Sequence, residues 1–429
     1  EGTEMVLTLF IVFLVLLFIG LPIAFCLGIS SFVYLWMADI PLIVIPQKMY
    51  SGIDVFVLLC IPGFILAGNL MNRGGISDRI IGFCNALVGH IQGGLAQANI
   101  VASMIFAGIS GTAVADTASL GAILIPAMQK EGYDVDFSCA VTAASSTIGP
   151  IIPPSMPMII AGTLTGLSVG RLFIAGAIPG VLLGIGLMIV AYFISKKRNY
   201  PKGEKVPRRL LLKEFFGAFW ALMLTVLILY GIVGGFFSPT EAAMVACLYA
   251  VVVGIFVYRD LSFRDLPLLT LEASITTASI IVLVGLANLF AWILTSEQIP
   301  QMVADFLLGI TKNKFLIILL INLLLLFVGT FMETIAALLT LFPTLLAVAL
   351  QVGIDPIHFS MIAVLNLMIG LTTPPVGVCL FVASSIGKIS ISRISRANIP
   401  FLAVSIFVLL LVSYIPALST WLPNLLFGR

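Results

Sequence analysis

Long apolar stretches recur along the chain, and they restrict its fold more than any other feature. The clearest lie at residues 5–21, 212–231, 242–258, 315–328 and 399–414. A helix needs about 20 apolar residues to cross a bilayer, whereas membrane strands would show short alternating runs. Only 9% of the residues are charged, against about 25% in an ordinary soluble domain. The sequence therefore predicts an all-α protein that crosses a membrane several times.

Helix-breaking prolines lie inside this apolar chain. The stretch IGPIIPPSMP, residues 148–157, contains Pro150, Pro153, Pro154 and Pro157. A proline lacks an N–H donor and clashes with the preceding turn, so a regular helix does not continue through this stretch. Irregular backbone is tolerated at membrane depth only where it is buried in protein or lines a polar cavity. We expect a broken helix whose freed carbonyl oxygens suit a hard cation, with a simple packing kink as the alternative.

The second half of the chain repeats this pattern at a shift near 220 residues. The segment IGPIIPPS (148–155) matches IGLTTPPV (369–376), so that Gly149 corresponds to Gly370. Further upstream Asp116 falls on Glu333, and each lies ten residues before a proline. A pattern that occurs twice favours two structural repeats, as in secondary transporters, where broken helices meet at the binding site.

A basic segment at residues 195–214 separates the two halves. It contains eight Lys or Arg, and loops of this kind stay in the cytoplasm. The first apolar stretch is flanked by Glu1 and Glu4 without positive charge, which favours a periplasmic N-terminus. We expect a first repeat at residues 1–194 and a second, inverted repeat at 215–429.

Each repeat is expected to contain a re-entrant hairpin followed by its broken helix. Gly111–Thr112 and Gly329–Thr330 allow sharp turns in otherwise helical sequence. The expected hairpins cover about 96–130 and 315–350, and the broken helices cover about 138–162 and 357–386.

Two carboxylates lie just after these turns. A charge at the bilayer centre costs about 2.5 to 3.5 kcal/mol, so Asp116 and Glu333 are candidates for a functional role. The alternative is that each caps the returning helix of its hairpin, because an acid near a helix N-terminus is stabilising.

Several motifs together resemble a known family. The segments GPIIPPS, GLTTPPVG, FAGISGTAVADTASLG and IPGFILAGNLMNRGGISDRI look like the large membrane subunit of TRAP transporters, the tripartite ATP-independent periplasmic uptake systems, and the overall similarity is to sialic acid members. The resemblance implies an elevator with a scaffold and a transport domain, in a fold similar to divalent-anion/sodium symporters. It also implies uptake of an organic acid driven by co-transported Na+ across the bacterial inner membrane.

The resemblance also implies partners and site residues. The partners would be a small four-helix membrane subunit and a soluble periplasmic substrate-binding protein. Sodium would be bound at Ser103, Ser110, Ser145, Gly149 and Pro150 in the first repeat, and at Gly329, Gly370, Thr372 and Thr373 in the second. Substrate contacts would come from Ser110, Asp116, Ser155 and Glu333.

Two other functions remain open at this stage. One is a stand-alone Na+/dicarboxylate or citrate symporter, which would need no binding protein. The other is an ion-translocating subunit of a membrane enzyme complex, which would need a proton wire or a catalytic constellation, whereas the intramembrane carboxylates here are isolated. We expect no enzyme activity, and the net charge of +2 gives no sign of a nucleic-acid partner.

Overall fold

The apolar stretches form helices in a computed structural model that describes residues 2–110, 112–311, 313–330, 332–374 and 376–428. The helices of the first half are α1 (Gly2–Ile19), α2 (Ile23–Met37), α3 (Val44–Ile53), η1 (Phe56–Leu59), α4 (Cys60–Arg73), α5 (Ile76–Val88), α6 (Gly94–Ser110), α7 (Ala113–Lys130), α8 (Val135–Ser146), α9 (Met156–Thr165) and α10 (Val169–Lys197). Those of the second half are α11 (Arg208–Val233), α12 (Pro239–Val252), η2 (Val253–Tyr258), α13 (Leu266–Ser296), α14 (Ile299–Ile310), α15 (Lys314–Gly329), α16 (Thr334–Gln351), α17 (Pro356–Gly370), α18 (Val378–Gly387), α19 (Ile391–Tyr414) and α20 (Ala417–Phe427).

Within the described ranges, seven helical segments are long and apolar enough to cross a bilayer. They are Phe56–Arg73, α10, α11, Pro239–Tyr258, α13, α16 and α19. The predicted all-α membrane fold is therefore confirmed.

The helices follow the same order in the two halves. Each half begins with a helix pair, α1–α2 or α11–α12, and later has a hairpin, an interrupted helix and a long helix, α10 or α19, in that order; the short α20 follows α19 in the second half. The hairpins are α6–α7 and α15–α16, and the interrupted helices are α8–α9 and α17–α18. The hairpins cover residues 94–110 with 113–130 and 314–329 with 334–351, and the interrupted helices cover 135–146 with 156–165 and 356–370 with 378–387.

The basic segment is shorter as a loop than predicted. Helix α10 continues to Lys197 and α11 begins at Arg208, so the connecting loop covers only residues 198–207. Lys and Arg are good helix formers, and Lys196 and Lys197 lie in the last turn of α10, where positive charge is stabilising. The positive charges alone therefore did not mark where the loop begins and ends. Pro207 does mark its end, because it directly precedes the first turn of α11.

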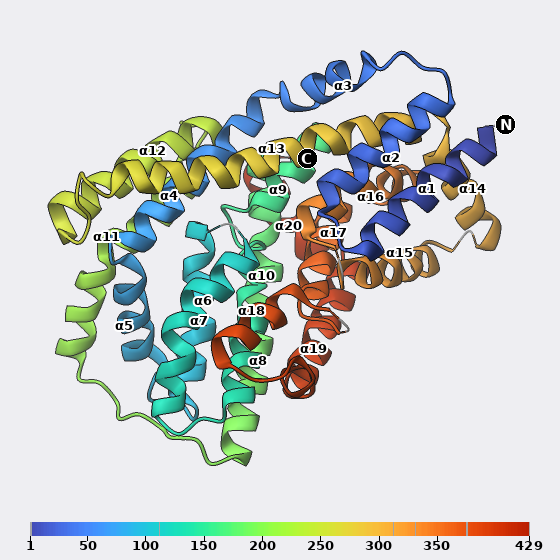
Figure 1. Ribbon diagram of the computed structural model, residues 1–429. Helices are drawn as coiled ribbons and strands as arrows, with labels where there is room; N and C mark the ends of the chain where they lie inside the picture. The colour runs from blue at the N-terminus through green and yellow to red at the C-terminus, as the bar shows by residue number, and fades with distance from the viewer. Residues whose placement is uncertain (1, 111, 312, 331, 375, 429) are drawn as a thin grey trace.

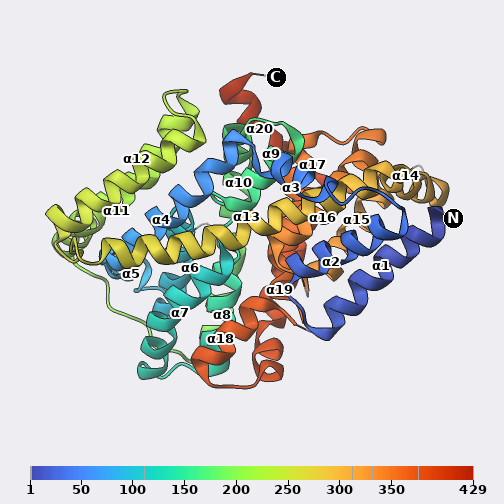
Figure 2. The same cartoon turned by 45° about the horizontal axis from the view of Figure 1, so that its top comes forward.

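A frame lies along one side of a core and extends over its two flanks (Figures 1 and 2). We call α1–α5 and α11–α14 the frame, in which α4 packs on α12, α5 on α11, and α13 crosses both α3 and α4. We call α6–α10 and α15–α20 the core, in which α8 packs against α7, α18 and α19, and α17 packs against α15. The two hairpins approach the middle of the molecule from different sides.

The first parts of the interrupted helices, α8 and α17, are deeply buried in the core. Residues 137–146 of α8 and residues 357–370 of α17 are buried without exception. Small residues such as Ala143 and Ala144 let neighbouring helices approach closely. Residues 147–155, which follow α8, are almost entirely buried in protein, and this explains how the chain tolerates irregular backbone there, whereas Pro374 beyond α17 is exposed.

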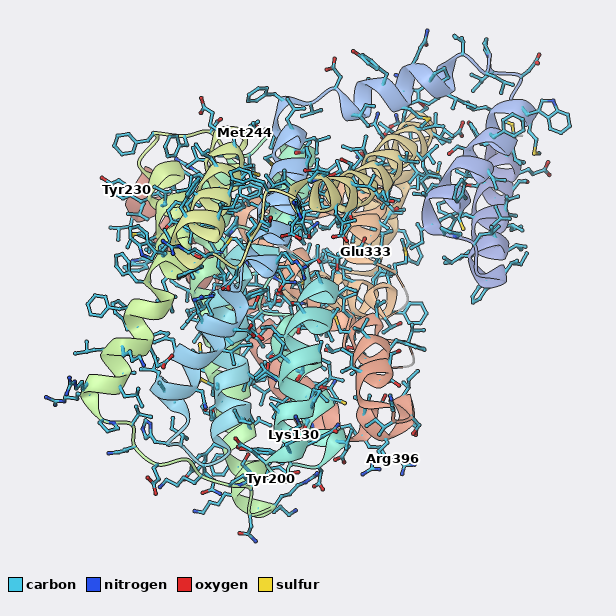
Figure 3. The ribbon with its side chains drawn as sticks, turned by 60° about the vertical axis from the view of Figure 1, so that its left-hand side comes forward. Lys130, Tyr200, Tyr230, Met244, Glu333 and Arg396 are labelled. Atoms are coloured by element: carbon cyan, nitrogen blue, oxygen red, sulfur yellow. The ribbon has the colours of Figure 1, made fainter. Side chains whose placement is uncertain are left out.

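A polar cluster fixes the inter-repeat loop to the core. Arg198 Nη1 lies 2.8 Å from Asp134 Oδ2, and the Tyr200 hydroxyl donates to the same carboxylate at 2.7 Å. The Tyr200 hydroxyl and the Arg198 guanidinium together hold the pKa of Asp134 below its usual value. Figure 3 shows Tyr200 near Lys130 and Arg396, at the opposite end of the molecule from Tyr230 and Met244.

Candidate functional site

The first break lies between α8 and α9, at residues 147–155. Its N–H groups form short turns, among them Gly149 N to Ser146 O at 3.3 Å. Ser155 caps α9 by accepting from Met158 N at 3.3 Å, and its hydroxyl donates to the carbonyl of Pro150. Ser155, predicted to contact substrate, thus stabilises the break itself, and it bonds the same Pro150 carbonyl that was predicted to bind sodium.

Asp116 packs directly on this break. The residue lies in the first turn of α7 and is fully buried. A Cβ added at Gly149 would lie 2.1 Å from Asp116 Oδ2, so only glycine leaves room for the carboxylate. The hairpin and the break are therefore in contact through the Asp116 carboxyl group and the backbone of Gly149.

A buried network joins the same hairpin to α8. Ser103 Oγ on α6 donates to Ser145 Oγ at 3.0 Å. Ser145 lies 3.4 Å from Asn99 Oδ1, and Asn99 Nδ2 donates to Thr142 Oγ1 at 2.6 Å. The structure thus brings Ser103 and Ser145, two of the predicted sodium ligands, together. Ser110 ends α6, but its side chain is outside the part of the chain that the structure describes.

The second hairpin and the second break meet through glycine backbone. A Cβ added at Gly370 would lie 2.6 Å from the Cα of Gly329. The carbonyl of Thr330 accepts from Gly377 N at 3.0 Å, which ties the hairpin tip to the far side of the break. The predicted sodium residues Gly329 and Gly370 are therefore neighbours.

The two threonines of the second break have internal partners. The hydroxyls of Thr372 and Thr373 both donate to the Ile369 carbonyl, at 3.0 and 2.9 Å. Asn398 Nδ2 on α19 donates to the Thr372 carbonyl at 2.8 Å. Each hydroxyl oxygen retains lone pairs, so these groups can still serve a cation.

Glu333 has the capping role that the sequence left open. It is the N-cap of α16 and accepts from Ile335 N at 2.9 Å and from Ala336 N at 3.2 Å. The corresponding N-cap of α7 is Thr112, so the predicted pairing of Glu333 with Asp116 is wrong in register. The prolines that suggested this pairing lie about one turn apart in the two helices.

Sequence reasoning missed a buried pair of amide side chains in the second half of the chain. Asn366 Nδ2 on α17 donates to Asn322 Oδ1 on α15 at 2.8 Å, and both residues are buried. At a shift near 220 residues, Asn322 corresponds to Asn99 and Asn366 to Ser145. Polar residues repeated at matching places in apolar helices were the signal that could have found this pair.

We call Ser103, Ser145 and the adjacent first break the first cluster, and Gly329, Gly370, Thr372 and Thr373 the second cluster. Both clusters present oxygen ligands from a hairpin and a break. Such hard ligands suit a group I or group II cation. Among the described residues, no three His, Cys, Asp or Glu side chains gather as a metal site.

Two interrupted helices that meet two hairpins inside a multi-pass helical protein define a secondary transporter. The chain belongs to the DctM family, the DctM component of the tripartite ATP-independent periplasmic transporters, whose model matches residues 10–418. It is therefore the large membrane subunit of a bacterial TRAP system for organic acids, not an enzyme. Membership implies a small membrane subunit and a periplasmic binding protein as partners, and it implies the inner membrane as location.

Relatives with different named substrates share this chain's full length. The sialic acid TRAP large permease SiaM of Vibrio cholerae is 45% identical, over 96% of this chain and 97% of the relative. The sialic acid permease SiaT of Haemophilus influenzae is 39% identical, over 99% of this chain and 69% of its own. The C4-dicarboxylate permease DctM of V. cholerae is 38% identical over 98% of each chain.

Two solved transporters share the fold at low sequence identity. YdaH of Alcanivorax borkumensis aligns with a TM-score of 0.61 and 15% identity, over 88% of this chain and 87% of its own. MtrF of Neisseria gonorrhoeae aligns with a TM-score of 0.63 and 14% identity, over 88% and 85%.

Proposed function

We propose that this subunit couples the uptake of sialic acid to Na+ entry, with the substrate delivered by a periplasmic binding protein. One observation carries the proposal: each hairpin tip is packed directly on an interrupted helix, through Asp116 and Gly149 in one half and Gly329 and Gly370 in the other. A cation bound at a break would therefore order the adjacent tip, which in turn completes the anion site.

The chemistry of the ligands supports Na+ coupling. Sodium is a hard cation that prefers oxygen, and the first cluster offers the Ser103 and Ser145 hydroxyls beside the carbonyl-rich break. In the second cluster the hydroxyls of Thr372 and Thr373 lie beside Gly370. The Asp116 carboxyl group lies beside the first break, and in its ionised form it would favour a cation there.

The relatives support sialic acid as the substrate. Identity to the V. cholerae sialic acid permease is 45%, against 42% to a C4-dicarboxylate permease of Pseudomonas aeruginosa, which covers 88% of this chain. The difference between these two identities is small, so the experiment compares the two substrates directly.

Movement of the core against the frame would provide alternating access. In this proposal the inverted repeats at residues 1–194 and 215–429 each supply part of the frame and part of the core. The core would slide as an elevator, carrying both clusters and the substrate together.

Uptake into proteoliposomes tests the coupling and the substrate. The vesicles hold this chain with its small subunit, and radiolabelled sialic acid is offered with and without the binding protein under an inward Na+ gradient. We expect accumulation that needs both Na+ and the binding protein and that excess succinate does not compete away. Equal accumulation with K+ would refute the coupling. Uptake without the binding protein would support the stand-alone symporter instead.

We also place the loop at residues 198–207 in the cytoplasm and the N-terminus in the periplasm. The positive charge of the loop supports this orientation. Trypsin added outside right-side-out vesicles should leave the loop intact and should cut it once the vesicles are inverted. Cleavage in the right-side-out vesicles would reverse the orientation.

A further inference from the structure

A cleft lies between the frame and the first hairpin. Two adjoining cavities, of about 160 and 410 Å³, share Asn69 and Asn72 of α4 as lining residues. The smaller cavity is also lined by Thr112 at the hairpin tip, and the larger by Arg73 and by Glu272 of α13. The cleft therefore runs along α4 and α13 to the tip next to the first cluster.

Hydrogen-bond donors line the α4 wall of this cleft. Asn69, Asn72 and Arg73 share one face of α4, because residues three and four apart are neighbours on a helix. Asn72 Oδ1 accepts from Ser77 Oγ at 2.8 Å, and the Asn72 amide nitrogen can donate to a ligand. Arg73 lies 3.6 Å from Asp265, and its side chain is 63% exposed. An exposed ion pair of this kind contributes little, so a ligand carboxylate can compete for the guanidinium.

Acceptor groups line the opposite wall. Glu272 and Thr276 lie one turn apart on α13 and face the two cavities. An unsubstituted dicarboxylate such as succinate offers only acceptors at neutral pH, so it has no donor for Glu272. A polyhydroxylated acid offers a carboxylate to Arg73 and hydroxyl donors to Glu272.

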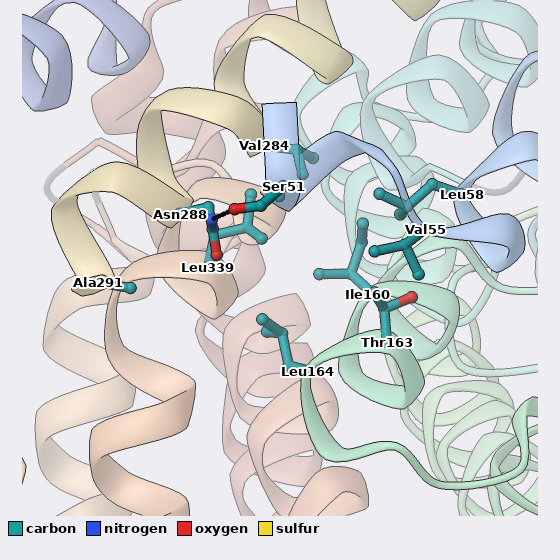
Figure 4. A pocket seen from close by; sticks show the side chains of 11 residues that line it. Ser51, Val55, Leu58, Ile160, Thr163, Leu164, Val284, Asn288, Ala291 and Leu339 are labelled. Atoms are coloured by element: carbon teal, nitrogen blue, oxygen red, sulfur yellow. Dashed lines mark hydrogen bonds between the residues drawn. The ribbon is translucent and has the colours of Figure 1, made fainter. Parts of the chain in front are cut away.

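A second cavity between the frame and the core has a different, mainly apolar lining. A cavity of about 230 Å³ lies between α3, α9, α13 and α16, lined mainly by apolar residues such as Val55, Leu58 and Ile160 (Figure 4). Asn288, which the repeat pattern places near the position of Asn69, donates there to the Lys48 carbonyl at 2.7 Å. Its amide joins α13 to α3, whereas the amides of α4 line an open cleft.

We propose that the cleft between α4 and α13 is a frame-side recognition site for a polyhydroxylated carboxylate. Asn69, Asn72 and Arg73 bind its carboxylate and hydroxyl groups and set the preference over short dicarboxylates. This inference rests on the proposed function, since it assumes that the subunit carries such an acid.

Uptake kinetics test the recognition. In the complex with the small subunit, Asn69→Ala and Asn72→Ala should each raise KM for sialic acid about 2- to 10-fold, the range expected for one lost neutral hydrogen bond. Asn72→Ala also removes the hydrogen bond to Ser77, so its effect on KM can combine a change in folding with a change in binding. Asn69→Ala leaves that hydrogen bond in place and therefore tests binding alone. The control is Ser274→Ala, which lies on α13 in a different groove, beside Cys247, and should leave KM unchanged.

Chemical protection gives a readout that does not need transport. Five of the six cysteines are buried and Cys247 is partly exposed, so a Cys247→Ala background should be quiet toward maleimide. In that background Asn72→Cys should react, and sialic acid should slow the reaction at least about threefold while succinate does not. An unchanged reaction rate and an unchanged KM for Asn69→Ala, in a complex that transports sialic acid, would overturn the site. Loss of Na+-dependent uptake in the wild-type complex would instead contradict the proposed function.

Discussion

Replacing Gly370 with alanine should separate the second hairpin from its break. A Cβ at this position would lie 2.6 Å from both the Cα and the carbonyl carbon of Gly329, and 2.9 Å from its oxygen. These atoms are backbone, so no side-chain rotation can relieve the contact. The hairpin tip must therefore move by several tenths of an ångström.

The cost follows from two opposing effects. Overpacking a closely packed interior costs about 1 to 3 kcal/mol. Alanine is favoured over glycine in a helix by up to about 1 kcal/mol, and less at the last residue of α17, which Gly370 occupies. We expect a net loss of about 1 to 2 kcal/mol in the free energy of unfolding. A matched control is Gly217→Ala in α11, where an added Cβ meets nothing within 4 Å; it should be neutral or slightly stabilising.

The assay is the apparent Tm of the purified complex in NaCl and in KCl, at one fixed scan rate because unfolding of such proteins is commonly irreversible. At about 2 °C per kcal/mol, Gly370→Ala should unfold a few degrees below Gly217→Ala. A ligand that binds only the folded state raises Tm, so the wild-type protein should be stabilised by Na+ and Gly370→Ala should lose most of this gain. Wild-type Tm and wild-type Na+ stabilisation in Gly370→Ala would refute the proposed contact between tip and break.

Three further predictions concern other polar groups. Ser145→Ala removes a hydroxyl from the first cluster and should raise the Na+ concentration for half-maximal uptake, without loss of membrane insertion; an unchanged Na+ dependence would exclude this hydroxyl as a ligand. Glu333→Ala removes an N-cap and should lower the free energy of unfolding by about 1 kcal/mol. Glu333→Asn should keep both the cap and uptake. A Glu333→Asn protein that is stable but inactive would show that the charge itself is needed. Because the pKa of Asp134 is lowered in the folded protein, its contribution to stability is present above the unfolded-state pKa and is lost as pH falls through the folded value. Tyr200→Phe should therefore make the loop at residues 198–207 easier to cleave at pH 7, and the difference should shrink as the pH falls below the ordinary aspartate pKa, as measured with a neutral protease and with pepsin.

Local rules account for the parts of the fold that were predicted correctly. Proline removes a donor and glycine permits a sharp turn, so hairpins and interrupted helices could be expected from the sequence. The same rules failed for the register of the hairpins. Pro126 and Pro343 are tolerated inside α7 and α16, so they mark neither helix end and do not align the two repeats.

The sequence by itself determined a helical membrane protein with two hairpins and two breaks, because helix length and chain breakage depend on residues close together in the chain. Only the tertiary structure decided what the two acids do. Glu333 is at the cap position and bonds the first N–H groups of its own helix, whereas Asp116 lies one turn further along and reaches the backbone of Gly149. That contact joins residues far apart in the chain, so it depends on how the hairpin packs against α8, and no local pattern encodes it.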